Sequence, residues 1–159
     1  MLFRSFVLLG IEIAFLWIPI LFHGIYGVMI VREAEHNFTA YNYTRNVFYS
    51  LQRISGVVAF LFLGFHMYTT RFYNYVWGVP INYATMHGWM SNPVWFAVYL
   101  IGVLAAVFHL TNGVSTFCIT WGITVGARAQ QAVWKACTAL FVVMGATGVM
   151  IVAAFRSRS

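Results

Sequence analysis

The chain has 159 residues, of which 62% are hydrophobic and only 8% are charged. A soluble domain of this length needs far more charge to cover its surface, so a water-soluble globular fold is excluded. The formal net charge of +6 rests on very few charged residues and does not indicate a nucleic-acid partner, because basic residues beside lipid headgroups explain it.

Four apolar stretches each approach or exceed the ~20 residues that an α-helix needs to cross a hydrocarbon core of roughly 30 Å. They predict transmembrane helices at about residues 5–31, 47–70, 93–120 and 128–155. We therefore expect an all-α, polytopic helical bundle in the lipid bilayer, with residues 1–159 forming a single domain. The first stretch lacks the cleavage-site pattern of a secretory signal peptide, so we interpret it as a membrane span.

The segments between the predicted helices differ in character. Residues 32–46 form the longest polar stretch, and the second helix is expected to end at Arg71. Residues 72–92 are rich in aromatic side chains and asparagine, which is typical of a loop in the membrane interface. Pro93 fits the first turn of the third helix, and residues 122–127 form a short link to the fourth. Lysine and arginine are divided almost evenly between the two sides, so the positive-inside rule does not orient the chain.

Three of the predicted helices carry an intramembrane histidine, at His23, His66 and His109. An ionisable side chain at such a depth is costly and indicates a functional site. His23 lies eight residues before Val31, and His109 lies eight residues before Phe117. Both are therefore about 12 Å from the same side of the membrane, at 1.5 Å per residue. Two imidazoles at one level on separate helices can approach a flat metallocycle from both faces, as bis-histidine haem iron requires.

Other interpretations of these histidines stay open at this point. An intramembrane histidine can simply form an interhelical hydrogen bond, although the matched depth of His23 and His109 favours haem. His66 lies in the opposite half of the membrane and indicates a second site whose partner ligand is missing. The sequence offers no compact set of four ligands for structural zinc. No predicted helix carries two histidines, which counts against cytochromes b of the respiratory bc type.

Three polar residues enter the second predicted helix near the level of His23 and His109. They are Gln52, Arg53 and Ser55, and we expect them to contact haem propionates. An arginine fork is well suited to a carboxylate. The alternative for Arg53 is a lipid headgroup.

Glu12 is the only carboxylate inside an apolar run. It lies on nearly the same face of its helix as His23 and about 16 Å further along the helix axis, in the half of the membrane that holds His66. A buried carboxylate can carry protons for a quinone, because desolvation favours its neutral form. The alternative is a carboxylate that reaches water at the membrane edge.

Several short motifs point to one family. Residues 22–27 (Phe-His-Gly-Ile-Tyr-Gly), 51–56 (Leu-Gln-Arg-Ile-Ser-Gly), 108–113 (Phe-His-Leu-Thr-Asn-Gly) and 120–125 (Thr-Trp-Gly-Ile-Thr-Val) resemble the di-haem cytochrome b558 subunits of succinate dehydrogenase. The resemblance extends from about residue 4 to the last helix. It implies a multi-pass anchor in the bacterial cytoplasmic membrane, within respiratory complex II of the tricarboxylic acid cycle.

Such an anchor takes electrons from a flavoprotein and an iron–sulfur subunit and passes them through two b haems to menaquinone, or in reverse as a fumarate reductase. It does not itself act on succinate. The resemblance also implies that the links at 32–46 and 122–127 face the cytoplasm, where the soluble subunits dock. Two other classes compete with this expectation: a haem b anchor of another respiratory dehydrogenase, and a non-redox membrane protein whose histidines pack or carry protons.

The sequence departs from the family pattern in one respect. Family members have five transmembrane helices, and the first carries a further haem-ligating histidine. By resemblance, His23 and His109 ligate the haem nearer the cytoplasm, whereas His66 ligates the outer haem with the histidine that is absent here. We therefore expect the sequence to be incomplete at its N-terminus; the alternative is that the outer site has changed.

Overall fold

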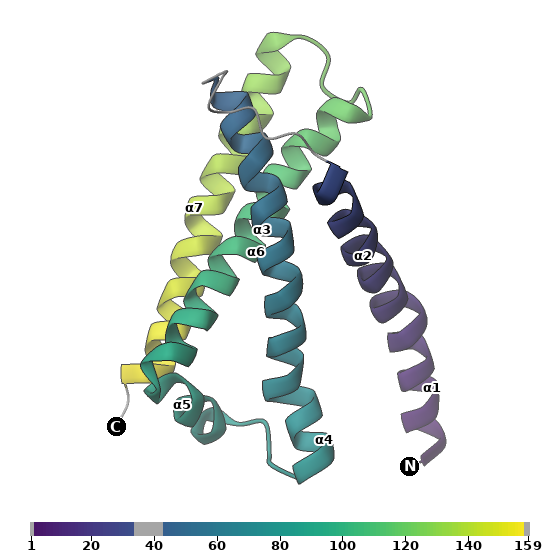
Figure 1. Cartoon of the computed structure of the whole chain (residues 1–159), viewed down its shortest axis with the longest axis vertical. Coiled ribbons are helices and arrows are strands. Elements are labelled where there is room, and N and C mark those ends of the chain that lie inside the picture. Colours follow the sequence, from purple (N-terminus) through teal and green to yellow (C-terminus); the bar gives the residue numbers. More distant parts are fainter. Residues whose placement is uncertain (1, 34–42, 158–159) are drawn as a thin grey trace.

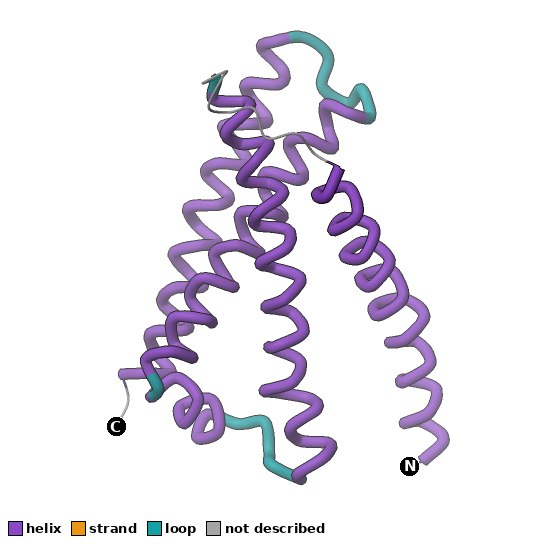
Figure 2. The backbone as a smooth tube through the Cα atoms, in the orientation of Figure 1, coloured by secondary structure: helices purple, strands orange, loops and turns teal. Residues whose placement is uncertain are grey.

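A computed structural model of the protein describes residues 2–33 and 43–157. This part of the chain is helical apart from short links and contains no strand (Figure 2). Four helical segments within it are long and apolar enough to cross a membrane, at Val7–Glu33, Thr44–Trp77, Pro93–Thr120 and Ala127–Ser157. The prediction of an all-α, polytopic membrane bundle is therefore confirmed. Most of the polar link predicted at 32–46 lies outside the described residues.

The first span contains a widened turn next to its proline. It consists of α1 (Leu2–Glu12), the π-helical turn η1 (Ile13–Trp17) and α2 (Ile18–Glu33). Pro19 has no N–H to offer the carbonyl of Phe15, and its ring would collide with that carbonyl in a regular helix. The backbone N–H of Ile18 instead donates to the carbonyl of Ile13, which widens the turn. The proline thereby re-aims α2 relative to α1 without ending the helix.

The second span extends beyond its expected end. It consists of α3 (Thr44–Met67), the π-helical turn η2 (Tyr68–Phe72) and α4 (Tyr73–Trp77). The Thr70 hydroxyl donates to the carbonyl of His66 over 2.6 Å, which satisfies a carbonyl near the disturbed turn. Gly78 then ends the span with a positive φ of 65°, a conformation that glycine adopts without a steric penalty.

A short helix lies within the segment 72–92 that was expected to be a loop. This helix, α5 (Tyr83–Ser91), begins at Asn82, whose side chain accepts from the Thr85 backbone N–H. With α4 it makes the expectation of a continuous loop wrong. Tyr83 Oη donates to the carbonyl of Ala154, and His87 Nδ1 lies 2.6 Å from the carbonyl of Phe155. Thus α5 satisfies the last carbonyls of the final helix, which otherwise have no partner in their own helix.

The third span forms the centre of the bundle, and the fourth packs against it. They are α6 (Pro93–Thr120) and α7 (Ala127–Ser157), and α6 packs against both α3 and α7 (Figure 1). The Phe62 ring of α3 lies against the backbone of Gly102 in α6, where a methyl group would collide with it. Small residues allow membrane helices to approach closely in this way. Buried aromatic and apolar side chains, Met90, Tyr99 and Val152, fill the end of the interface that lies next to α5.

The first span stands apart from this centre. It meets the other helices where α2 packs on α3, and none of its described side chains is buried (Figure 1). The space between α2 and the pair α3–α6 is therefore not filled by helix packing.

We predict that Gly102→Ala destabilises the bundle, because the added methyl group displaces the Phe62 ring. The free energy of unfolding in mixed detergent micelles should fall by about 1–3 kcal/mol. Gly64→Ala is the matched control, since nothing lies within 4 Å of a methyl group at that position. Equal unfolding free energies for the two variants would contradict the proposed close contact.

Candidate functional site

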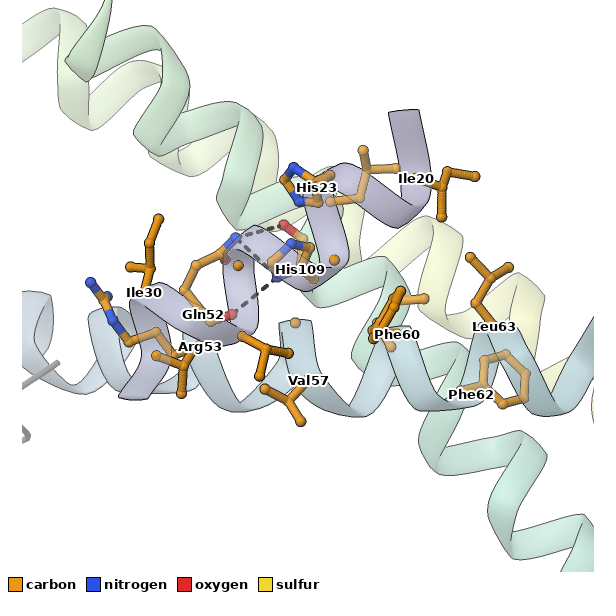
Figure 3. A pocket seen from close by; sticks show the side chains of 18 of the residues that line it. Ile20, His23, Ile30, Gln52, Arg53, Val57, Phe60, Phe62, Leu63 and His109 are labelled. Carbon is orange, nitrogen blue, oxygen red and sulfur yellow. Dashed lines mark hydrogen bonds between the residues drawn. The ribbon is translucent and has the colours of Figure 1, made fainter. Parts of the chain in front are cut away.

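A cavity of about 640 Å³ lies between α2, α3 and α6 (Figure 3). Its wall is almost entirely apolar. The exceptions are His23 from α2, Gln52 and Arg53 from α3, and His109 from α6. A large apolar cavity with a few convergent polar groups is the usual form of a small-molecule or cofactor site.

The structure brings His23 and His109 together across this cavity. Their ring centroids are 6.1 Å apart, with an angle of 69° between the ring planes (Figure 3). When a metal ion lies between two imidazoles, each metal–nitrogen bond is about 2 Å long, and the ring centre lies about 1 Å beyond the nitrogen. The two ring centroids are then about 6 Å apart. The observed spacing therefore suits two imidazoles that ligate one metal ion.

The His109 ring is held in one position against α3. Its Nδ1 lies 3.0 Å from the backbone carbonyl oxygen of Gln52. The ring lies over Gly56, where a Cβ atom would come within 2.7 Å of the imidazole Cε1. When Nδ1–H donates to this carbonyl, the proton is on Nδ1 and the Nε2 lone pair is available to a metal.

The Gln52 side chain also fixes the position of His109, through bonds to the backbone and to Asn112 of α6. Its Nε2 donates to the carbonyl of His109 over 3.1 Å, and its Oε1 accepts from Asn112 Nδ2 over 2.7 Å. The Ser55 hydroxyl, which is buried, donates to the Gln52 carbonyl. Gln52 and Ser55 thus form hydrogen bonds with protein groups around His109. Sequence reasoning gave no role to Asn112, although a polar residue three positions after an intramembrane histidine is a usable signal.

Arg53 lines the cavity and carries a buried side-chain donor without a partner in the described structure. Its Nη1 donates to the Tyr49 carbonyl over 3.3 Å, and its guanidinium carbon lies 3.3 Å from the centroid of the Tyr49 ring. Its Nε is buried and has no hydrogen-bond partner in the described structure. A buried, unpartnered guanidinium donor is costly and fits an anionic group of a ligand.

His66 does not line the cavity. It lies on α3, with its Nδ1 3.4 Å from the Tyr99 hydroxyl of α6 and its ring stacked on Phe62. Among the described residues, no group of three or more His, Cys, Asp or Glu side chains could hold a metal ion.

Glu12 lies away from the cavity and forms a two-pronged ion pair with Arg71. Its Oε2 is 2.7 Å from Arg71 Nη2, and its Oε1 accepts from Arg71 Nη1 over 3.0 Å. The pair joins α1 to η2, at the end of the second span that lies beyond His66. The sequence did not indicate this partner, because 59 positions separate the two residues.

The fold and the site together define a class, a multi-pass membrane protein in which paired histidines face an apolar cavity between helices. A family model for the succinate dehydrogenase/fumarate reductase transmembrane subunit matches residues 31–146. The succinate dehydrogenase cytochrome b558 subunit of Bacillus subtilis (strain 168) is 34% identical over 146 residues, which cover 92% of this chain and 72% of that protein. No solved structure matches the chain. The chain belongs to the succinate dehydrogenase/fumarate reductase transmembrane subunits.

We predict that Gln52→Leu loosens the contact between α3 and α6, because Asn112 and the His109 carbonyl both lose a partner. The free energy of unfolding in detergent should fall by roughly 1–3 kcal/mol. Gln131→Leu, at an exposed position of α7, is the matched control and should change it little. Similar values for the two leucine variants would contradict the role of the Gln52 amide.

Proposed function

We propose that this chain is the electron-transfer anchor of a succinate:menaquinone oxidoreductase. In this proposal it receives electrons from a flavoprotein and an iron–sulfur subunit and delivers them to menaquinone. The observation that supports it most directly is the approach of His23 and His109 across an apolar cavity, with 6.1 Å between ring centroids. The Bacillus subtilis relative is a cytochrome b558 subunit, which agrees with a haem-based role.

The donor set around the cavity fits haem b. His23 and His109 would ligate the haem iron, and the unpartnered Nε of Arg53 would bind a propionate carboxylate. When bound, haem b supplies an iron that accepts and releases one electron. The residues of this chain hold both imidazoles at one level, place the Gln52 carbonyl where it can accept from His109 Nδ1–H, and surround the site with an apolar wall. Gln52 and Ser55 belong to the proposed site because their hydrogen bonds fix the position of His109.

A second haem would use His66 in the outer half of the membrane. The described residues supply no second imidazole to His66, so the other axial ligand would come from outside them. On α3 the His109 ring lies over Gly56, and His66 follows ten residues later. The two sites would therefore differ in depth by roughly 15 Å, at 1.5 Å per residue.

The proposed orientation follows from the two ends of the bundle. The C-terminal end of α2, the start of α3 and the α6–α7 link lie at one end, whereas α4 and α5 lie at the other (Figure 1). We place the first end in the cytoplasm of a bacterial cell, where the soluble subunits would dock. Glu12 and His66 then lie toward the outer half of the cytoplasmic membrane, where Glu12 would carry protons for menaquinone.

Haem loading tests the proposal. In the purified complex, His23→Ala and His109→Ala should each lose one haem per complex, because the iron loses an axial ligand. Gly56→Ala should lose the same haem, since its methyl group occupies the space of the His109 ring. Pyridine haemochrome assays and dithionite-reduced spectra give the haem count, and Gly64→Ala should leave it unchanged. A wild-type complex without a b-type α-band would refute the proposal.

A proton-carrying role for Glu12 has its own test. Glu12→Gln should slow menaquinone reduction about tenfold or more while both haem spectra stay intact, because the amide cannot deliver a proton. Arg71→Gln breaks the same ion pair but keeps the carboxylate, so it should retain most of the activity. Equal turnover of Glu12→Gln and wild type with menaquinone analogues would show that the ion pair only joins α1 to η2.

A further inference from the structure

A buried chain of hydroxyl groups lies beside His66 at the outer end of the α3–α6 contact. The Tyr99 hydroxyl of α6 contacts both Thr69 Oγ1, in η2, and His66 Nδ1, which is 3.4 Å away. Thr69 is 1% exposed and Tyr99 is 4% exposed. Polar groups buried so completely in a membrane bundle are rare without a role, and the proposed electron transfer does not by itself require these two.

The contacts in this chain allow an order of donors that leaves His66 Nε2 free. Thr69 Oγ1 lies 3.2 Å from the Phe65 carbonyl and 3.1 Å from the His66 carbonyl, and neither carbonyl can donate. When the single Thr69 proton goes to one of these carbonyls, Thr69 accepts from Tyr99. The one Tyr99 proton is then used, so the phenol oxygen accepts from His66 Nδ1–H. This order places the His66 proton on Nδ1.

The other nitrogen of His66 is left free by this arrangement. The described residues offer Nε2 no hydrogen-bond partner, although the ring is held by a stack on Phe62 and an edge contact with Tyr99. His66 is otherwise exposed toward the outside of the described bundle. A fixed ring with a free Nε2 lone pair is the form in which histidine binds a metal.

We propose that Tyr99 and Thr69 are positioning residues that hold His66 as the Nδ1–H tautomer and turn its Nε2 toward the iron of an outer haem. This inference rests on the proposed second b haem. The hydrogen bond from Nδ1–H to the phenol makes Nε2 more basic, which favours the ferric state and lowers the midpoint potential of that haem. The arrangement mirrors the inner site, where His109 of α6 donates to a carbonyl of α3.

A redox titration of the purified complex, followed by EPR and reduced-minus-oxidised spectra, tests this role. Tyr99→Phe removes only the hydroxyl, so the midpoint potential of the outer haem should rise, or that haem should be lost, while the inner haem is unchanged. Thr69→Val leaves the phenol in place but removes its acceptor, and it should shift the same potential upward by less. Tyr68→Phe is the matched control, since its ring contacts are with Phe72, Tyr73 and Trp77 and not with His66.

The outcomes separate this inference from the function on which it rests. A wild-type complex without a second haem refutes the outer site itself. Two haems in the wild type, with an outer potential that Tyr99→Phe leaves unchanged or lowers, refute the positioning role while the proposed function stands. An upward shift that Tyr68→Phe reproduces also refutes it, because the effect would not depend on the bond to His66.

Discussion

The contact between α3 and α6 is the constraint on which both histidine sites depend. Lipid chains are as apolar as the helices, so the hydrophobic effect does not drive this contact, and close packing and polar bonds must hold it. Gly56 admits the His109 ring and Gly102 admits the Phe62 ring. Gln52 and Asn112 bond across the inner part of the interface, and Tyr99 bonds across the outer part. Each of the two histidines, His109 and His66, is thereby oriented by the helix opposite its own.

The first span packs much less closely than α3 and α6 do. A cavity large enough for a cofactor needs a wall that does not close on it, and α2 provides one by packing on α3. The π-helical turn before Pro19 and the Glu12–Arg71 ion pair set the course of this span at its outer end. His23 therefore faces His109 from a helix with no buried side chain of its own among those described.

The polar side chains near the inner site divide into two groups with different tasks. Gln52, Ser55 and Asn112 satisfy one another and the backbone around His109, so they fix a protein conformation. The buried Nε of Arg53 has no partner in the described structure, so this donor is available to a ligand. Residues of the two groups are neighbours in the sequence. The sequence therefore predicted one role, contact with haem propionates, for Gln52, Arg53 and Ser55.

The sequence by itself determined the membrane class, the four spans and the depth of each intramembrane histidine, because span length and helical rise depend only on local composition and spacing. It also determined the family, through short motifs around His23, Gln52 and His109. Only the tertiary structure decided which side chains meet. The partners Glu12–Arg71, Gln52–Asn112 and His66–Tyr99 come from different helices, and no local pattern specifies the rotation of one helix against another. Side-chain packing at glycines sets that rotation, and with it the partner that each histidine meets.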